Sequence, residues 1–182
     1  MNTVQPIRDK EKVMDIAEYL KEKNQRDYVM FMTGIYSGLR ISDILKLRVR
    51  DVKEKNHINM REKKTGKERR FKINRDLRTI LKEYIQGKPD YEFLFKNPHK
   101  NEPITRQQAY NILSEAGKEF GIDSIGTHTL RKTFGFHMYQ MTKDAAMIMD
   151  ILNHSTVQYT LRYIGITQDT KDKAFERLSF KR

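Results

Sequence analysis

The sequence contains no cysteine and no apolar run long enough to cross a membrane. Without cysteine, neither a disulfide framework nor a thiolate metal site can form, as is typical of proteins from a reducing compartment. A membrane span needs roughly 18 consecutive apolar residues, and the N-terminus also lacks the apolar segment of a signal peptide. The chain has no H-E-x-x-H pair and no obvious acidic cluster, which argues against a metal-dependent nuclease. These absences predict a cytoplasmic protein.

Acidic residues are also fewer than basic ones. The 182 residues include 24 Asp and Glu but 36 Lys and Arg, which gives a formal net charge of +12 at pH 7. This charge exceeds what a small domain needs for solubility, and it indicates a polyanionic partner. A basic protein without such a partner could have the same composition, so the sequence motifs are needed to decide whether the chain binds a polyanion. The length predicts a single domain over residues 1 to 182 with a core of its own.

Helical periodicity dominates the first part of the chain. Apolar residues at helical spacing among Lys and Glu predict an amphipathic helix over residues 9 to 23. Residues 28 to 36 are apolar on more than one face, which predicts a buried helix that ends at Gly38 in the left-handed conformation. A short helix follows, with Arg40 at the turn and Asp43 in the first helical turn. This pattern is also that of a helix-turn-helix.

The pattern changes to alternation over residues 49 to 74. Short apolar segments separated by polar turns predict a small antiparallel sheet of three strands at the edge of the domain. The turn that contains Lys64 is basic, and we expect it to form a hairpin tip that reaches a phosphate backbone, with a plain solvated turn as the alternative. The expected fold is therefore mainly α with a small three-stranded antiparallel sheet (α+β).

Helices return in the second half. Thr105 and Gln108 stand at the spacing of a capping box, and so do Ser155 and Gln158, so each pair predicts a helix start. Residues 167 to 178 predict a final amphipathic helix. No internal repeat or low-complexity segment divides the chain.

The residue types between positions 126 and 163 suit phosphate chemistry. His128 and Arg131 lie three residues apart in the first turn of a predicted helix, where free backbone N–H groups favour an anion. A tyrosine that attacks a phosphodiester needs cations for the nonbridging oxygens and a proton acceptor, because the pKa of a phenol is about 10. Arginine and histidine supply these functions. Without further evidence, the role expected of Tyr163 is that of a helix residue that packs its ring, and the nucleophile is the less common alternative.

Five motifs occur in one order along the chain: Gly38-Leu39-Arg40-Ile41-Ser42-Asp43, Lys64-Thr65-Gly66, His128-Thr129-Leu130-Arg131, Leu152-Asn153-His154-Ser155 and Tyr163. This set resembles the catalytic motifs of the tyrosine recombinases, the phage integrase family, and the resemblance covers roughly residues 26 to 166. It implies the tyrosine recombinase catalytic-domain fold. It also implies DNA strand cleavage through a covalent 3′-phosphotyrosine and rejoining by a free 5′-hydroxyl, with no metal or ATP as cofactor.

The resemblance also implies a role for each motif residue. These roles are phosphate binding by Arg40 and Arg131, general acid for Lys64, acid/base for His128, phosphate support by His154, nucleophile for Tyr163, and orientation of Arg40 by Asp43. We expect Arg40, His128, Arg131, His154 and Tyr163 to converge in one basic cleft.

Two departures from the family pattern qualify these expectations. Asn153 replaces a glycine that usually precedes the second histidine, and asparagine tolerates the left-handed conformation. The N-terminal core-DNA-binding domain that is usual in the family is absent from these 182 residues, so we expect weak, salt-sensitive binding of double-stranded DNA. The family also implies a homo-oligomer on DNA, in which the helix 167–178 packs in cis or exchanges between subunits. The alternative function is a DNA-binding module of the same fold without recombinase activity.

Overall fold

The computed structural model describes residues 4 to 61, 68 to 122, 125 to 166 and 175 to 179. The helices in this part of the chain are α1 (Lys10–Lys23), α2 (Gln25–Ser37), α3 (Ile41–Ile44), α4 (Val49–Val52), α5 (Arg75–Tyr84), α6 (Arg106–Glu119), α7 (Thr127–Thr142), α8 (Ala145–Ile151) and α9 (Val157–Tyr163). The strands form two antiparallel pairs, β1 (His57–Arg61) with β2 (Glu68–Lys72), and β3 (Lys96–Asn97) with β4 (Lys100–Pro103).

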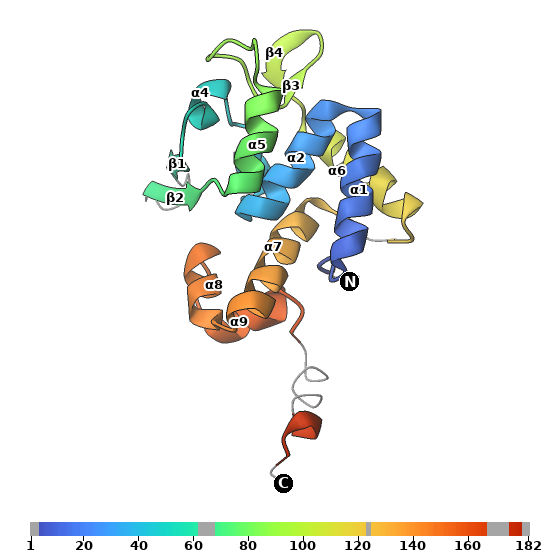
Figure 1. The fold of residues 1–182 in the computed structure, drawn as a ribbon, viewed down its shortest axis with the longest axis vertical. Coiled ribbons are helices and arrows are strands. Elements are labelled where there is room, and N and C mark those ends of the chain that lie inside the picture. Colours follow the sequence, from blue (N-terminus) through green and yellow to red (C-terminus); the bar gives the residue numbers. More distant parts are fainter. Residues whose placement is uncertain (1–3, 62–67, 123–124, 167–174, 180–182) are drawn as a thin grey trace.

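Helix α2 lies at the centre of the larger part of the molecule, between α1, α5 and α7 (Figure 1). Val29 and Met30 pack into one buried cluster, and Phe31 and Met32 pack into a second one. The prediction of a helix buried on more than one face is therefore confirmed. The helix ends as predicted at Gly38, which has the left-handed φ of 63° and places Arg40 at the start of α3.

Helix α7 connects this larger part to α8 and α9 (Figure 1). Leu130, near its start, belongs to the cluster of α1, α2 and α6. Phe134 and Phe136, further along, pack against a third cluster formed by Ile148, Leu152, Ile164 and Ile166. The motif at the start of α7 therefore lies where the larger part meets the third cluster, and the motifs of His154 and Tyr163 belong to that third cluster.

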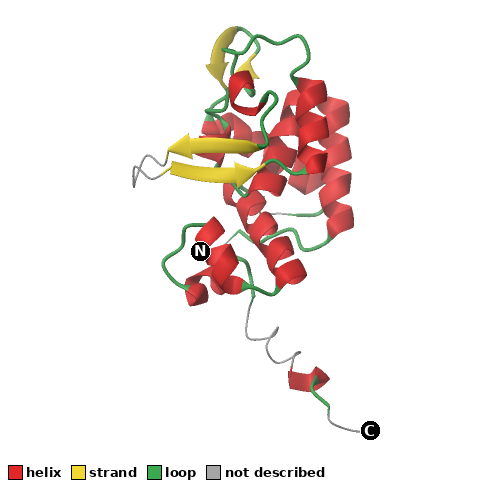
Figure 2. Ribbon diagram, turned by 60° about the vertical axis from the view of Figure 1, so that its left-hand side comes forward, coloured by secondary structure: helices red, strands yellow, loops and turns green. Residues whose placement is uncertain are grey.

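The predicted three-stranded sheet is wrong in its strand count within the described residues. Val49–Val52, expected as a strand, forms helix α4, while β1 and β2 pair as a two-stranded hairpin that projects from the helices (Figure 2). Val49 and Val52 are both buried and stand three residues apart, which is also helical spacing. The Asp51 carboxylate accepts a hydrogen bond from the Arg48 N–H at 2.8 Å and stabilises this helix start. The mainly helical fold with small antiparallel sheets is confirmed.

The two predicted capping boxes differ in outcome. At α6, Thr105 and Gln108 exchange hydrogen bonds of 2.8 and 3.1 Å, as predicted. At α9, the N-cap is Thr156 in place of Ser155, because Thr156 has the extended backbone and accepts from the Tyr159 N–H at 3.0 Å.

The predicted helix over residues 167 to 178 falls mostly outside the described residues. Phe175 and Leu178, which are described, are 74% and 63% exposed. None of the helices in the described ranges is long and apolar enough to span a membrane.

Candidate active site

A small cavity of about 320 Å³ lies where the α2–α3 turn, the start of α7 and the α8–α9 connection meet. The residues that line it are Arg40, His128, Arg131, Asn153, His154, Ser155, Tyr159 and Tyr163. The structure thus brings five sequence-predicted site residues together. Asp43 lies one helical turn from Arg40, where its N–H donates to the Arg40 carbonyl at 2.8 Å. Lys64 lies outside the described residues.

Arg131 is the most buried of these side chains, with only 4% of its surface exposed. Its guanidinium donates hydrogen bonds to the backbone carbonyls of Gly38 and Leu152. It therefore joins α7 to the turn before Arg40 and to the turn before His154. Burial lowers the pKa of Arg131 to about 10, so the group stays charged at neutral pH.

The two histidines of the cavity are neutral at pH 7. Burial, followed by the charge of Arg131, lowers the pKa of His128 from 6.5. For His154, burial together with the charges of Arg131 and Arg40 lowers the pKa to about 4. A neutral imidazole has a free ring nitrogen that can accept a proton, so either ring can act as a general base.

The hydrogen bonds of His154 determine which ring nitrogen carries its proton. Its Nδ1 lies 3.1 Å from the Thr160 hydroxyl oxygen, which donates its own hydrogen to the Thr156 carbonyl at 3.0 Å. Because a hydroxyl has one hydrogen and a carbonyl can only accept, Nδ1 must be the donor to Thr160. The neutral ring therefore keeps Nε2 as its proton acceptor.

Tyr163 is half-buried among other rings and cations. Its ring centroid lies 4.7 Å from that of His154 and 6.1 Å from that of Tyr159, and the Lys132 ammonium lies 5.1 Å from it. Burial raises the pKa of Tyr163, and the charge of Arg131 opposes only part of this rise. The resting phenol is therefore neutral, and it needs a proton acceptor before it can attack.

Sequence reasoning missed three residues at or near this site. Tyr159 stands four residues before Tyr163, and Lys132 stands four residues after His128, so helical spacing could have indicated both. Arg69 of β2 donates hydrogen bonds to the carbonyls of Asp150 and Ile151 at 2.8 and 2.7 Å. Nothing in the sequence signals the Arg69 contact, because it joins segments about eighty residues apart. The expected left-handed conformation of Asn153 is observed, with a φ of 49°.

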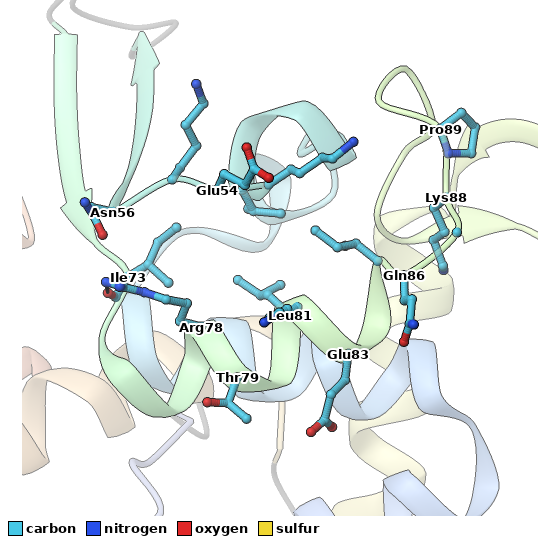
Figure 3. Close-up of a pocket in the computed structure, with 16 residues that line it drawn as sticks. Glu54, Asn56, Ile73, Arg78, Thr79, Leu81, Glu83, Gln86, Lys88 and Pro89 are labelled. Atoms are coloured by element: carbon cyan, nitrogen blue, oxygen red, sulfur yellow. Dashed lines mark hydrogen bonds between the residues drawn. The ribbon is translucent and has the colours of Figure 1, made fainter.

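A larger hollow of about 1180 Å³ lies between α5 and the turn that connects α4 to β1 (Figure 3). Leu81 points into it from α5, whereas Glu54 and Asn56 approach from the opposite side. Among the described residues that line it, none is a histidine, a tyrosine or a cysteine. The larger hollow thus offers Lys, Arg and Glu side chains, whereas the smaller cavity combines arginines with histidines and tyrosines that can transfer protons. Within the described ranges, no group of three or more His, Asp and Glu side chains is placed to hold a metal ion.

Comparisons with known proteins match nearly the whole chain. The sequence profile of the Phage integrase family matches residues 8–169. The chain is 50% identical over 176 residues to the probable integrase/recombinase YoeC of Bacillus subtilis (strain 168), with 97% of each chain covered. It is 29% identical over 171 residues to the tyrosine recombinase XerA of Pyrococcus furiosus, covering 92% of this chain and 59% of XerA.

A solved structure shares the fold. The XerH site-specific recombinase, bound to palindromic difH substrate in a post-cleavage complex, superposes with a TM-score of 0.74 at 20% identity. The match covers 97% of this chain and 54% of XerH. The chain thus spans almost all of YoeC but only slightly more than half the length of XerA and XerH.

Proposed function

The chain belongs to the phage integrase family, and on this basis we propose that it cleaves and rejoins DNA strands as a tyrosine recombinase, with Tyr163 as the nucleophile. The observation that carries the proposal is the cavity in which Tyr163 lies with two arginines and two histidines. The net charge of +12 and the DNA-directed names of the relatives support double-stranded DNA as the substrate.

In the cleavage step, the Tyr163 oxygen attacks the scissile phosphorus and the bond to the 5′ oxygen breaks. Arg131 and Arg40 neutralise the charge that gathers on the nonbridging oxygens. A histidine of the cavity, His128 or His154, accepts the phenolic proton, and the lowered pKa of each ring leaves it unprotonated at neutral pH and so free to accept. Lys64, assigned by the motif it occupies, protonates the departing 5′ oxygen.

In the rejoining step, a free 5′-hydroxyl attacks the phosphotyrosine and the bond to Tyr163 breaks. The phosphotyrosine preserves the free energy of the original phosphodiester, so the two steps need no external energy source. The protons move back along the same groups, because the reverse reaction must use the same transition state. Asp43, one turn from Arg40, orients Arg40 in this scheme.

The same proposal covers the domain, the location and the assembly. We treat residues 1 to 182 as one catalytic domain, supported by the family match over residues 8–169. A cytoplasmic location belongs to the proposal because the protein would act on cellular DNA. Two strands must be present for rejoining, so we expect a homo-oligomer on DNA, with the segment 167–178 packing in cis or exchanging between subunits.

The test is covalent capture on a nicked DNA substrate whose cleavage product cannot be religated. We expect the wild-type protein to form an adduct that survives a denaturing gel, and Tyr163→Phe, which lacks only the hydroxyl, to form none. Tyr91→Phe, at an exposed position that does not line the cavity, serves as the matched control and retains the adduct. If the wild type shifts the DNA on a native gel but forms no adduct at any pH or salt concentration, the DNA-binding module without catalysis is the correct function.

A further inference from the structure

The first described residues of the chain lie along one face of α7, close to α9 (Figure 1). The Ile7 N–H donates to the Thr133 hydroxyl at 2.9 Å, and the Ile7 carbonyl lies 3.0 Å from His137 Nε2. Ile7 and Thr133 are buried, with 4% and 0% of their surfaces exposed. Residues 4 to 8 are therefore packed into the fold by specific hydrogen bonds on both backbone groups of Ile7.

This segment reaches Tyr163 through Lys132. The Lys132 ammonium donates a hydrogen bond of 2.7 Å to the Val4 carbonyl, and it also lies 5.1 Å from the centroid of the Tyr163 ring. A cation at this distance from an aromatic ring is attracted to the electrons of the ring. The bond to Val4 restricts an otherwise mobile lysine to one position, so the Val4 carbonyl determines where the cation meets the ring.

The same segment also holds the end of the helix that carries Tyr163. Arg8 donates a hydrogen bond of 3.0 Å to the carbonyl of Gly165, two residues after Tyr163, and its guanidinium lies 5.7 Å from the Phe136 ring centroid. Gly165 has a φ of 78°, and a Cβ there would lie only 3.2 Å from the Arg8 guanidinium and 3.3 Å from Pro6. Residues 4 to 8 and the end of α9 are thus in close contact.

We propose that residues 4 to 8 position the nucleophile. The Val4 carbonyl holds Lys132 against the ring of Tyr163, and Arg8 holds the end of α9. The proposal rests on the proposed function, since it needs Tyr163 to be the attacking group. Neither Lys132 nor Arg8 lines the cavity, so both act through Tyr163. A displacement of about 1 Å in an attacking group can lower a rate about 100-fold, so loss of either contact should slow the chemical step more than DNA binding.

The first experiment compares Lys132→Met with Lys23→Met. Lys23 lies 5.2 Å from the centroid of the Tyr19 ring, so its replacement removes the same charge and the same kind of contact far from Tyr163. Adduct formation is measured in a single turnover at saturating nicked DNA, and DNA affinity is measured separately by anisotropy. We expect Lys132→Met to form the adduct at least tenfold more slowly than Lys23→Met, with the dissociation constants of the two variants within twofold of each other.

The second experiment tests Arg8 without relying on activity. Hydrogen exchange of the α9 amides should be at least fivefold faster in Arg8→Gln than in wild type, unchanged in Lys23→Met, and largely restored in Arg8→Lys, which keeps a cationic donor. Unchanged exchange in Arg8→Gln would overturn the proposal even if the wild type formed no adduct.

The outcomes separate the two proposals. If the wild type forms no adduct, the proposed function fails, and the exchange measurement still decides whether the segment holds α9. If the wild type forms the adduct and Lys132→Met does so at the rate of Lys23→Met, the positioning role is refuted and the proposed function stands. If Lys132→Met weakens DNA binding while its saturated rate is unchanged, Lys132 is a phosphate contact and the positioning role is also refuted.

Discussion

Arg131 combines two tasks in one side chain. It lines the cavity, where a fixed positive charge can face a phosphate, and it also donates to the carbonyls of two turns that come from distant parts of the chain. Arg40, by contrast, is exposed. The two arginines thus have the same proposed role toward the phosphate but different consequences for stability, because Arg131 is buried and joins two distant turns whereas Arg40 is exposed.

Lysine substitutions at these two positions separate the tasks. In Arg131→Lys, one ammonium cannot reproduce the hydrogen bonds that the planar guanidinium donates to the Gly38 and Leu152 carbonyls. A buried carbonyl left without a donor costs roughly 1–3 kcal/mol, so we expect the free energy of unfolding to fall by about 2–4 kcal/mol. In Arg40→Lys we expect a change within about 0.5 kcal/mol, as for other exposed positions. Urea denaturation measures the stability, and covalent capture should show reduced adduct in both variants. Equal stability of the two variants would contradict the bridging role of Arg131.

His154 predicts a pH dependence of stability. The pKa of His154 is about 4 in the folded state and 6.5 in its unperturbed form, so the unfolded state binds more protons between these values. Stability therefore falls as the pH is lowered from about 6.5 toward 4, and it is independent of this group above that range. The melting temperature of the wild type should drop below that of His154→Gln progressively over this window. Parallel pH profiles of the two proteins would show that His154 titrates normally.

At the scale of elements, the β1–β2 hairpin is fastened to the end of α8. Arg69 donates to the Asp150 and Ile151 carbonyls, which belong to the last turn of α8. The Asp150 carbonyl also accepts from the Asn153 N–H at 2.9 Å. A cation at a helix C-terminus is also favoured by the helix dipole. The β1–β2 strand pair is thereby held near the motif of His154.

Arg69→Met should release this connection. We expect a loss of about 1–2 kcal/mol in the free energy of unfolding, since hydrogen bonds from charged groups contribute roughly 1.5–3 kcal/mol and part of this is recovered by solvent. Arg70→Met is the matched control, because Arg70 is exposed and its guanidinium lies 3.0 Å from His57 Nδ1 within the hairpin. Adduct formation should be slower in Arg69→Met than in Arg70→Met. The prediction fails if both variants have the same stability and the same rate.

At the scale of the whole molecule, the candidate site lies at a junction of the three buried clusters. Arg40 comes from the larger part of the molecule, whereas His154 and Tyr163 come from the small cluster of α8 and α9, and α7 joins the two. The site is therefore complete only when both parts are packed on α7. The chain as a whole has 36 Lys and Arg residues against 24 Asp and Glu residues, a formal net charge of +12 at pH 7.

This charge predicts a steep dependence of DNA binding on salt. Each neutralised phosphate lowers the logarithm of the binding constant by about 0.9 for each tenfold increase in salt, so six to ten contacts would cost about 10³–10⁵ in affinity between 50 and 200 mM salt. Titration of a labelled duplex by anisotropy over this range measures the slope. An affinity that did not change with salt would rule out phosphate contacts as the main source of binding.

The sequence by itself determined most of the helices and five of the residues that line the small cavity. Helical spacing and capping residues are local properties, so the buried α2, the left-handed Gly38 and the capping box of Thr105 were all predictable. The order of the motifs predicted that Arg40, His128, Arg131, His154 and Tyr163 share one cavity.

Only the tertiary structure decided how those residues are held. Residues 49 to 52 form α4 in place of the predicted strand, because two buried valines three residues apart are too short a pattern to distinguish a helical turn from a strand. The contacts of Arg69, Lys132 and Arg8 join residues 82, 128 and 157 positions apart. Such contacts depend on how the helices pack, and neither periodicity nor motif spacing carries that information.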